Sequence, residues 1–331
     1  MKKIINDPHD VVPEMVNGMT RAYPQYIEKI EGTEAVVRSD KDSMKGKVGI
    51  VSGGGSGHEP THAGYVGEGM LSAAVCGQVF TSPTPDQIYA AIKAVNQGQG
   101  VFLVVKNYSG DVMNFDMAKD LASMDNIPVK SIVVDDDIAV ENSLYTQGRR
   151  GVAGTIFMHK ILGAVAQQGA SLDEIDALAH KVLPNIKTIA VALSAATNPE
   201  VGKPGFVLKD DEIEYIDTID YKNCYRREKI KPSKELVEEL VGKLNNEMHL
   251  DGNKKYACLV NGMGATPLME QYIFANDVLN KLQEFNIKPS FMKIGNYMTS
   301  IDMAGISLTL FEIKDAKWLD YLNYPVKTIA W

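Results

Sequence analysis

Residues 47–60, KVGIVSGGGSGHEP, decide the fold. They begin with a short apolar run that contains β-branched residues, and they continue directly into a turn rich in glycine and serine. Such a run is typical of a buried strand, and residues 101–106 and 131–134 have the same character. Helical stretches at residues 85–96 and 114–124 separate these runs. Strand and helix in alternation predict a parallel sheet with a ligand site at the carboxyl ends of its strands.

A second alternating series occupies the other half of the chain. It consists of expected strands at residues 187–193, 256–260 and 306–313 and expected helices at residues 233–245 and 267–284. Because one compact core rarely holds 331 residues, we predict two α/β domains with largely parallel sheets. Their expected boundary lies near Pro184, which gives an N-terminal domain of residues 1–184 and a C-terminal domain of residues 185–331.

The composition sets limits on function. Hydrophobic residues make up 45% of the chain and charged residues 23%, as is usual for a packed protein. A net charge of -8 disfavours a direct nucleic-acid partner. No apolar run is long enough to cross a membrane and the first ten residues do not resemble a signal peptide, so we expect a cytoplasmic location. Three cysteines without a C-x-x-C pair predict neither a disulfide framework nor a zinc site.

Three other polar motifs invite a metal or anion interpretation. Residues 58–62, HEPTH, satisfy the H-E-x-x-H string, but Pro60 prevents the helix on which that zinc motif depends, and we expect no metal there. Residues 135–137 are three consecutive aspartates, whose alternating side chains cannot all face one ion, so a structural or helix-capping role is favoured. Residues 148–151, GRRG, either clamp an anion or the carboxylates of a partner, or form a solvated basic turn.

The turn after residues 47–52 is the first candidate binding loop. It is not a Walker A loop because no Gly-Lys-Ser/Thr follows, and it lacks the G-x-G-x-x-G spacing of a dinucleotide site. Gly55 and Gly57 allow backbone N–H groups to approach a ligand, and Ser56 adds a hydroxyl group. This chemistry suits a ligand rich in oxygen atoms, whereas the plain alternative is a turn without a ligand.

A second polar segment, KNYSGD at residues 106–111, ends the next expected strand. In the expected sheet, it lies at the same edge as His58. A small polyhydroxy ketone would need donors such as Lys106 or Asn107 and an acid/base pair such as His58 with Asp111. The alternatives are that Asp111 caps the following helix and that His58 is structural.

Six strings together resemble the dihydroxyacetone-binding K subunit of bacterial dihydroxyacetone kinase: GGGSGHEP at residues 53–60, FTSPTPDQI at 80–88, KNYSGD at 106–111, VVDDDIAV at 133–140, GRRGVAGT at 148–155 and NGMGATPLMEQY at 261–272. The resemblance covers essentially the whole chain. It implies a homodimer that binds dihydroxyacetone, or a similar small ketose, and no cofactor of its own. ADP or ATP and Mg²⁺ would belong to a separate nucleotide-binding L-type subunit, which a phosphotransferase-system phosphoprotein regenerates. The implied function is therefore that of a glycerone kinase subunit in glycerol metabolism.

The same resemblance assigns roles to residues. It implies a substrate site formed by Gly55, Ser56, Gly57, His58, Lys106 and Asp111. His58 and Asp111 would act as acid and base, and Lys106 would contact the hydroxyl groups of the ketone.

The chain departs from the family at one position. The family has a G-I-H-G-E-P-G loop before an R-E-K-I-like segment, and its histidine forms a hemiaminal with the ketone. Here residues 218–224 read TIDYKNC, and Asp220 stands in the place of that histidine. A carboxylate cannot form a nitrogen adduct with a ketone, so covalent anchoring by this residue is excluded.

Three interpretations follow from Asp220. The chain is a kinase subunit that works without covalent anchoring, or Lys222 or Cys224 replaces the histidine as nucleophile. In the third, it is a non-catalytic paralog that senses the ketone for a transcription factor, as the coactivator relatives of the family do. We favour the kinase subunit because the acid/base pair and the other family strings are intact.

Overall fold

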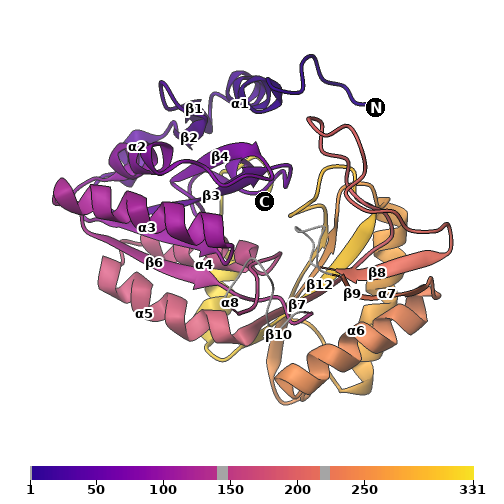
Figure 1. The fold of residues 1–331 in the computed structure, drawn as a ribbon. Helices are drawn as coiled ribbons and strands as arrows, with labels where there is room; N and C mark the ends of the chain where they lie inside the picture. The colour runs from indigo at the N-terminus through magenta and orange to yellow at the C-terminus, as the bar shows by residue number, and fades with distance from the viewer. Residues whose placement is uncertain (1, 140–147, 217–223) are drawn as a thin grey trace. The chain divides into compact units, whose positions relative to one another are not determined.

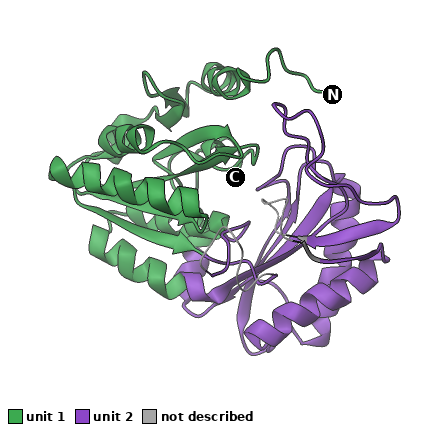
Figure 2. Ribbon diagram, in the orientation of Figure 1, with its two compact units in different colours: residues 1–134, 155–182, 321–331 green, residues 135–154, 183–320 purple. Residues whose placement is uncertain are grey.

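The computed structural model describes residues 2–139, 148–216 and 224–331, and these residues form two compact units (Figure 2). Unit 1 comprises Met1–Val134, Thr155–Val182 and Tyr321–Trp331, and unit 2 comprises Asp135–Gly154 and Leu183–Asp320. The two α/β units confirm the expected fold class. They differ from the two continuous domains that we predicted, because residues 135–154 belong to the second unit and residues 321–331 to the first.

Unit 1 contains a six-stranded sheet in the order β1-β2-β4-β3-β5-β6. Its strands are β1 (Ile27–Lys29), β2 (Ala35–Arg38), β3 (Gly49–Ser56), β4 (Ala73–Val79), β5 (Val101–Lys106) and β6 (Val129–Val134). The four strands β4, β3, β5 and β6 are parallel, as predicted for β3, β5 and β6, and β1 and β2 add an antiparallel edge. The glycine-rich segment thus ends a strand, β3, that has a parallel neighbour on each side.

Helices cover both faces of this sheet (Figure 1). The helical segments of unit 1 are α1 (Val11–Ala22), α2 (Pro85–Val95), α3 (Ser109–Met124), α4 (Thr155–Gln167), α5 (Leu172–Val182) and the short helices η1 (Lys41–Met44) and η2 (Ala63–Tyr65). Val51 and Leu103 pack in the core with the apolar residues of α2 and α3. Because side chains alternate along a strand, Ser52 points to the other face, where α4 lies. Burial of each large apolar side chain stabilises the fold by roughly 1.5–3 kcal/mol.

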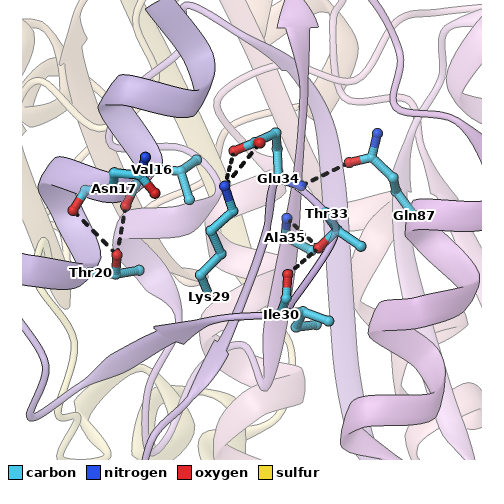
Figure 3. Close-up of polar contacts among 9 residues, drawn as sticks. All are labelled: Val16, Asn17, Thr20, Lys29, Ile30, Thr33, Glu34, Ala35 and Gln87. Carbon is cyan, nitrogen blue, oxygen red and sulfur yellow. Dashed lines mark hydrogen bonds and ion pairs between the residues drawn. The ribbon is translucent and has the colours of Figure 1, made fainter.

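The edge hairpin of β1 and β2 is joined to α2 by polar contacts (Figure 3). Lys29 Nζ lies 2.9 Å from both carboxylate oxygens of Glu34. The backbone N–H of Glu34 donates to Gln87 Oε1 on α2 at 3.0 Å. In the turn, Thr33 Oγ1 donates to the carbonyl of Ile30 and accepts the N–H of Ala35. These bonds satisfy backbone groups that an edge hairpin would otherwise leave open.

Unit 2 contains a second six-stranded sheet, in the order β11-β10-β12-β7-β8-β9. Its strands are β7 (Ile186–Ala192), β8 (Glu212–Ile216), β9 (Cys224–Lys229), β10 (Lys255–Gly262), β11 (Phe291–Gly295) and β12 (Gly305–Ile313). Only β10 and β11 pair in parallel, so the prediction of a largely parallel sheet is wrong for this unit. An apolar run identifies a buried strand, but it does not encode the direction in which that strand runs.

The helical segments of the rest of the chain are α6 (Ser233–Met248), α7 (Leu268–Glu284), α8 (Ala316–Asn323) and the short η3 (Leu183–Asn185). Leu240 of α6 and Val278 of α7 share a core with Val191 and Leu308 of the sheet. Of the helices within the described ranges, none has the length and apolar character needed to span a membrane.

Candidate functional site

The glycine-rich segment forms the carboxyl end of β3 itself, because residues 53–56 belong to the strand and Gly57 follows it, whereas the sequence pattern predicted a turn after residue 52. Gly57 has a φ of 105°, a conformation that side-chain-bearing residues rarely adopt. Its N–H donates to both carboxylate oxygens of Glu59, at 3.0 and 3.1 Å. A methyl group on Gly55 would lie 2.6 Å from the backbone nitrogen of Thr81, so the backbone of residues 80–81 requires glycine there. The Ser56 hydroxyl donates to the Gly77 carbonyl at 2.7 Å. The backbone of residues 77–81 therefore packs against Gly55 and accepts the Ser56 hydroxyl, two contacts that we had assigned to a ligand from the sequence.

His58 lies in the loop after this segment. Its side chain is buried, with 2% of the residue exposed. The ring lies 5.2 Å from the ring of Phe80, measured between centroids, and the planes are tilted by 41°. The carbonyl of His58 accepts the N–H of Thr61 at 3.0 Å, which shapes the loop as a tight turn. One face of the imidazole ring therefore packs against Phe80.

Lys106 and Asp111 meet above β3. Lys106 is the last residue of β5 and Asp111 lies in the first turn of α3, and both are buried. A methyl group on Gly54 would stand 3.1 Å from Lys106 Nζ and 3.5 Å from Asp111 Oδ2. Lys106 Nζ also lies 5.5 Å from the centre of the Tyr108 ring. The ends of β3 and β5 and the first turn of α3 therefore bring Gly54, Lys106 and Asp111 together in unit 1.

The carboxyl group of Asp111 has the properties of a proton acceptor. Burial raises its pKa, while the Lys106 ammonium group and a hydrogen bond with Ser82 act in the opposite direction. Its Oδ1 atom is buried and has no protein partner among the residues that the structure describes. A raised pKa and an oxygen without a protein partner suit a group that accepts a proton from a substrate hydroxyl.

The sequence interpretation missed Glu59 and Ser82. Burial raises the pKa of Glu59, although the Gly57 N–H and the Lys106 ammonium group oppose the shift. Ser82 bonds to Asp111 and would be 2.8 Å from a methyl group on Gly110. Both residues lie in strings that carry the family resemblance, HEP and TSP, but no spacing rule connects Ser82 with Asp111 of α3.

The zinc interpretation of residues 58–62 finds no support. His62 Nδ1 lies 2.9 Å from His159 Nε2 and 3.2 Å from Ser52 Oγ. Over the ranges 2–139, 148–216 and 224–331, no three His, Cys, Asp or Glu side chains are grouped as metal ligands.

The consecutive aspartates of residues 135–137 have a structural role within unit 2. Asp136 accepts the N–H groups of Val152 and Gly154 at 2.8 and 2.7 Å, and it accepts the Thr188 hydroxyl at 2.5 Å. Asp137 pairs with Arg150, with 3.4 Å between oxygen and nitrogen. These bonds fix residues 148–154 against the strand that contains Thr188.

The arginines of residues 148–151 take part in ion pairs within unit 2. Arg150 is fully buried beside Asp137. Arg149 binds the carboxylate of Glu247, with one of its two contacts at 3.2 Å. Neither a solvated basic turn nor a dedicated anion clamp describes these contacts.

The residue in the place of the covalent histidine and its two possible substitutes lie in or next to the range 217–223, which the structure does not describe. Asp220 and Lys222 fall outside the described residues. Cys224 begins β9, which pairs with β8, but its side chain is also outside the description. The comparison of these three positions therefore rests on the sequence.

Comparisons with known proteins agree with this fold. The family model described as the Dak1 domain matches residues 17–330. The PTS-dependent dihydroxyacetone kinase, dihydroxyacetone-binding subunit DhaK, of Lactococcus lactis subsp. lactis (strain IL1403) is 64% identical over 100% of this chain and 99% of its own. The corresponding subunit of kinase 1 from Listeria innocua serovar 6a is 58% identical over 100% of both chains.

A solved structure is similar over nearly the whole chain. It is described as the dihydroxyacetone kinase operon co-activator Dha-DhaQ, and it is 45% identical with a TM-score of 0.90. The match covers 97% of this chain and 98% of that one. The co-activator thus shares the fold of this chain. The chain therefore belongs to the Dak1 family, together with these dihydroxyacetone-binding kinase subunits and the operon co-activator.

Proposed function

We propose that this chain is the dihydroxyacetone-binding subunit of a phosphotransferase-system-dependent dihydroxyacetone kinase. The observation that carries the proposal is the convergence of buried Lys106 and Asp111 above Gly54, in the unit that also holds His58. Identity to two kinase subunits of 64% and 58%, against 45% to the co-activator, supports the same assignment. The substrate is dihydroxyacetone or a ketose of similar size.

The residues of unit 1 would divide the work as follows. The Lys106 ammonium group donates to a substrate hydroxyl, and Gly55, Ser56 and Gly57 form the wall of the site. Asp111 accepts the proton of the hydroxyl group that attacks the phosphorus atom, since its raised pKa favours proton uptake. His58 acts with Asp111 as the second acid/base group.

The phosphoryl donor would be held by a partner. We propose a separate L-type subunit with ADP or ATP and Mg²⁺, regenerated by a phosphotransferase-system phosphoprotein, and a homodimer of the present chain. In such an arrangement the present chain binds and orients the ketone, and catalysis of phosphoryl transfer depends mainly on position and charge. With Asp220 in the place of the family's histidine, hydrogen bonds would hold the ketone without a covalent bond to that residue.

Titration calorimetry with dihydroxyacetone tests the binding role. The account predicts saturable binding that is lost in Asp111→Ala, with retained binding in the matched variant Asp116→Ala on the exposed side of α3. Equal binding by wild type and Asp111→Ala would contradict the proposed site.

Borohydride treatment with dihydroxyacetone tests whether Lys222 forms a Schiff base with the ketone. A stable mass increase that Lys222→Ala lacks supports the Schiff base, and the absence of an adduct in wild type excludes it.

The second candidate is a ketone-sensing co-activator of a transcription factor. The similarity to the solved co-activator over 97% of the chain is the observation that favours it. A sensor binds the ketone without phosphoryl transfer and changes transcription of a reporter operon in its presence. A kinase subunit transfers phosphate and leaves the reporter unchanged.

A further inference from the structure

His62 ends the loop that carries His58, and its ring enters the interior of unit 1. Both rings of the pair, His62 and His159, are buried. The His62 ring contacts Ser52 on β3 and His159 on α4, with Nδ1 3.2 Å from Ser52 Oγ and 2.9 Å from His159 Nε2. The far end of residues 57–62 is therefore attached to a strand and a helix that belong to the framework of the unit.

The hydrogen bonds around Ser52 identify the position of a proton. Ser52 Oγ lies 2.6 Å from the carbonyl oxygen of Val104, and only the hydroxyl can donate in that contact. With its single proton so used, Ser52 must accept in the contact with His62, which places a proton on His62 Nδ1. The single Nδ1–H of His62 is then shared between Ser52 Oγ and His159 Nε2 in a three-centre hydrogen bond, so His159 Nε2 is an acceptor and the proton of neutral His159 resides on its Nδ1. The opposite assignment would set the lone pairs of Ser52 and His62 against each other.

The surroundings favour neutral rings. His62 Nε2 and His159 Nδ1 are buried, and neither has a protein partner among the residues that the structure describes. An imidazolium ion would carry an N–H on both nitrogens and would bring a second positive charge close to Lys106. Burial, reinforced by Lys106, by His159 and by His58, holds the pKa of His62 well below its ordinary value. Burial lowers the pKa of His159 to about 3, again with a contribution from Lys106.

We propose that His62 is a positioning residue for His58, and that it holds the loop as a neutral imidazole protonated on Nδ1 between Ser52 and His159. Its neutral state places no additional positive charge near Lys106. The inference rests on the proposed function for the consequence in catalysis, but the position of the proton and the anchoring of the loop can be measured without it.

Side-chain ¹H–¹⁵N correlation spectra of the full-length chain, labelled with ¹⁵N-histidine, test the proton. With six histidines in the chain, single variants assign the signals. We expect His62 and His159 to remain neutral between pH 5 and 8 and to carry their protons on Nδ1. A His62 ring protonated on Nε2, or one that titrates in this range, would overturn the proposal.

Three variants test the anchoring. His62→Asn keeps an N–H donor near the place of Nδ1, whereas His62→Leu removes it, and Ser72→Ala is a matched control because Ser72 is a buried serine that accepts the N–H of Ile50 and contacts no imidazole. In His62→Leu we expect shifted His58 ring signals and a transfer rate lower by about tenfold to a hundredfold, with little change in the KM for ketone. His62→Asn and Ser72→Ala should keep the His58 signals and a rate within about threefold of wild type.

Unchanged His58 signals in folded His62→Leu would refute the anchoring, whatever the activity. If His62→Leu does not fold, the comparison passes to Ser52→Ala, which removes the contact between His62 and β3: shifted His58 ring signals support the anchoring, and unchanged ones refute it. A wild-type chain that transfers no phosphate would contradict the proposed function alone, because the spectra still report the His62 proton and the His58 position.

Discussion

Lys106 Nζ and Asp111 Oδ2 lie on the same side of β3, 3.1 and 3.5 Å from the position that a Cβ atom on Gly54 would occupy. A buried cation and a buried carboxyl group thus share a space that only a glycine leaves open. The Lys106 ammonium group partly offsets the rise that burial causes in the pKa of Asp111. The site depends on this shared space as much as on the two charged groups.

Gly54→Ala should therefore impair ketone binding without unfolding the chain. The new methyl group crowds the Lys106 side chain, which must shift by a few tenths of an ångström, while Asp111 Oδ2 stays at ordinary contact distance, and we expect about tenfold weaker binding in calorimetry. Gly242→Ala in α6 is the matched control, because a methyl group there meets nothing within 4 Å. Equal affinities of the two variants would show that the space above Gly54 is not used by the ketone.

Asp111→Asn should separate activity from stability. Loss of the proton acceptor should lower the transfer rate by about 10²- to 10⁴-fold. Because burial raises the pKa of Asp111, its contribution to stability is lost as pH rises through the folded-state pKa, and the amide avoids this loss. We expect the Tm of Asp111→Asn relative to wild type to be higher at pH 8 than at or below pH 3.8, the ordinary carboxyl value. A Tm difference that is the same at both pH values, with Asp116→Asn as control, would contradict the assignment.

Asp136→Asn should change the pH dependence of unfolding. Burial raises the pKa of Asp136 from 3.8 to about 6, so the folded chain keeps a proton that the unfolded chain releases within this window. Wild type should lose about 3 kcal/mol relative to the variant as pH rises from 3.8 to about 6. Asp135→Asn, at the exposed neighbour, is the control. Parallel curves of unfolding free energy against pH for wild type and Asp136→Asn would refute the shift.

His58→Ala should abolish phosphoryl transfer while the chain remains folded. The variant removes an acid/base group, and its ring is replaced by a small cavity beside Phe80. Circular dichroism and gel filtration check the fold and the assembly, and His180→Ala at an exposed position is the control. Turnover equal to wild type would remove His58 from the acid/base pair.

The sequence predicted the elements that surround the site because they have strong local patterns. The apolar, β-branched run of residues 101–106 corresponds to β5 without a shift, and the polar segment after it contains both Lys106 and Asp111. Strand β4, AAVCGQV, was missed because its small residues give no clear period, although β4 is a direct neighbour of β3.

Contacts between residues far apart in the chain could not be predicted from the sequence. The antiparallel pairing of β7 with β12 joins residues more than a hundred positions apart, and no local pattern gives its direction. The bond between Ser82 and Asp111 and the contact of His62 with His159 likewise depend on tertiary structure. Residues 135–154 belong to the second unit because Asp136 bonds to Thr188, a buried contact that composition does not reveal.

The most direct test of the central claim is phosphate transfer to dihydroxyacetone by this chain. The assay combines it with an ADP-loaded nucleotide subunit and its phosphoprotein donor, and includes a control without ketone. The account predicts dihydroxyacetone phosphate in the complete mixture and none with Asp111→Asn, so that Asp220 in the place of the family's histidine does not prevent the reaction. No product from a wild-type chain that binds the ketone in calorimetry would contradict the kinase assignment and favour the sensor.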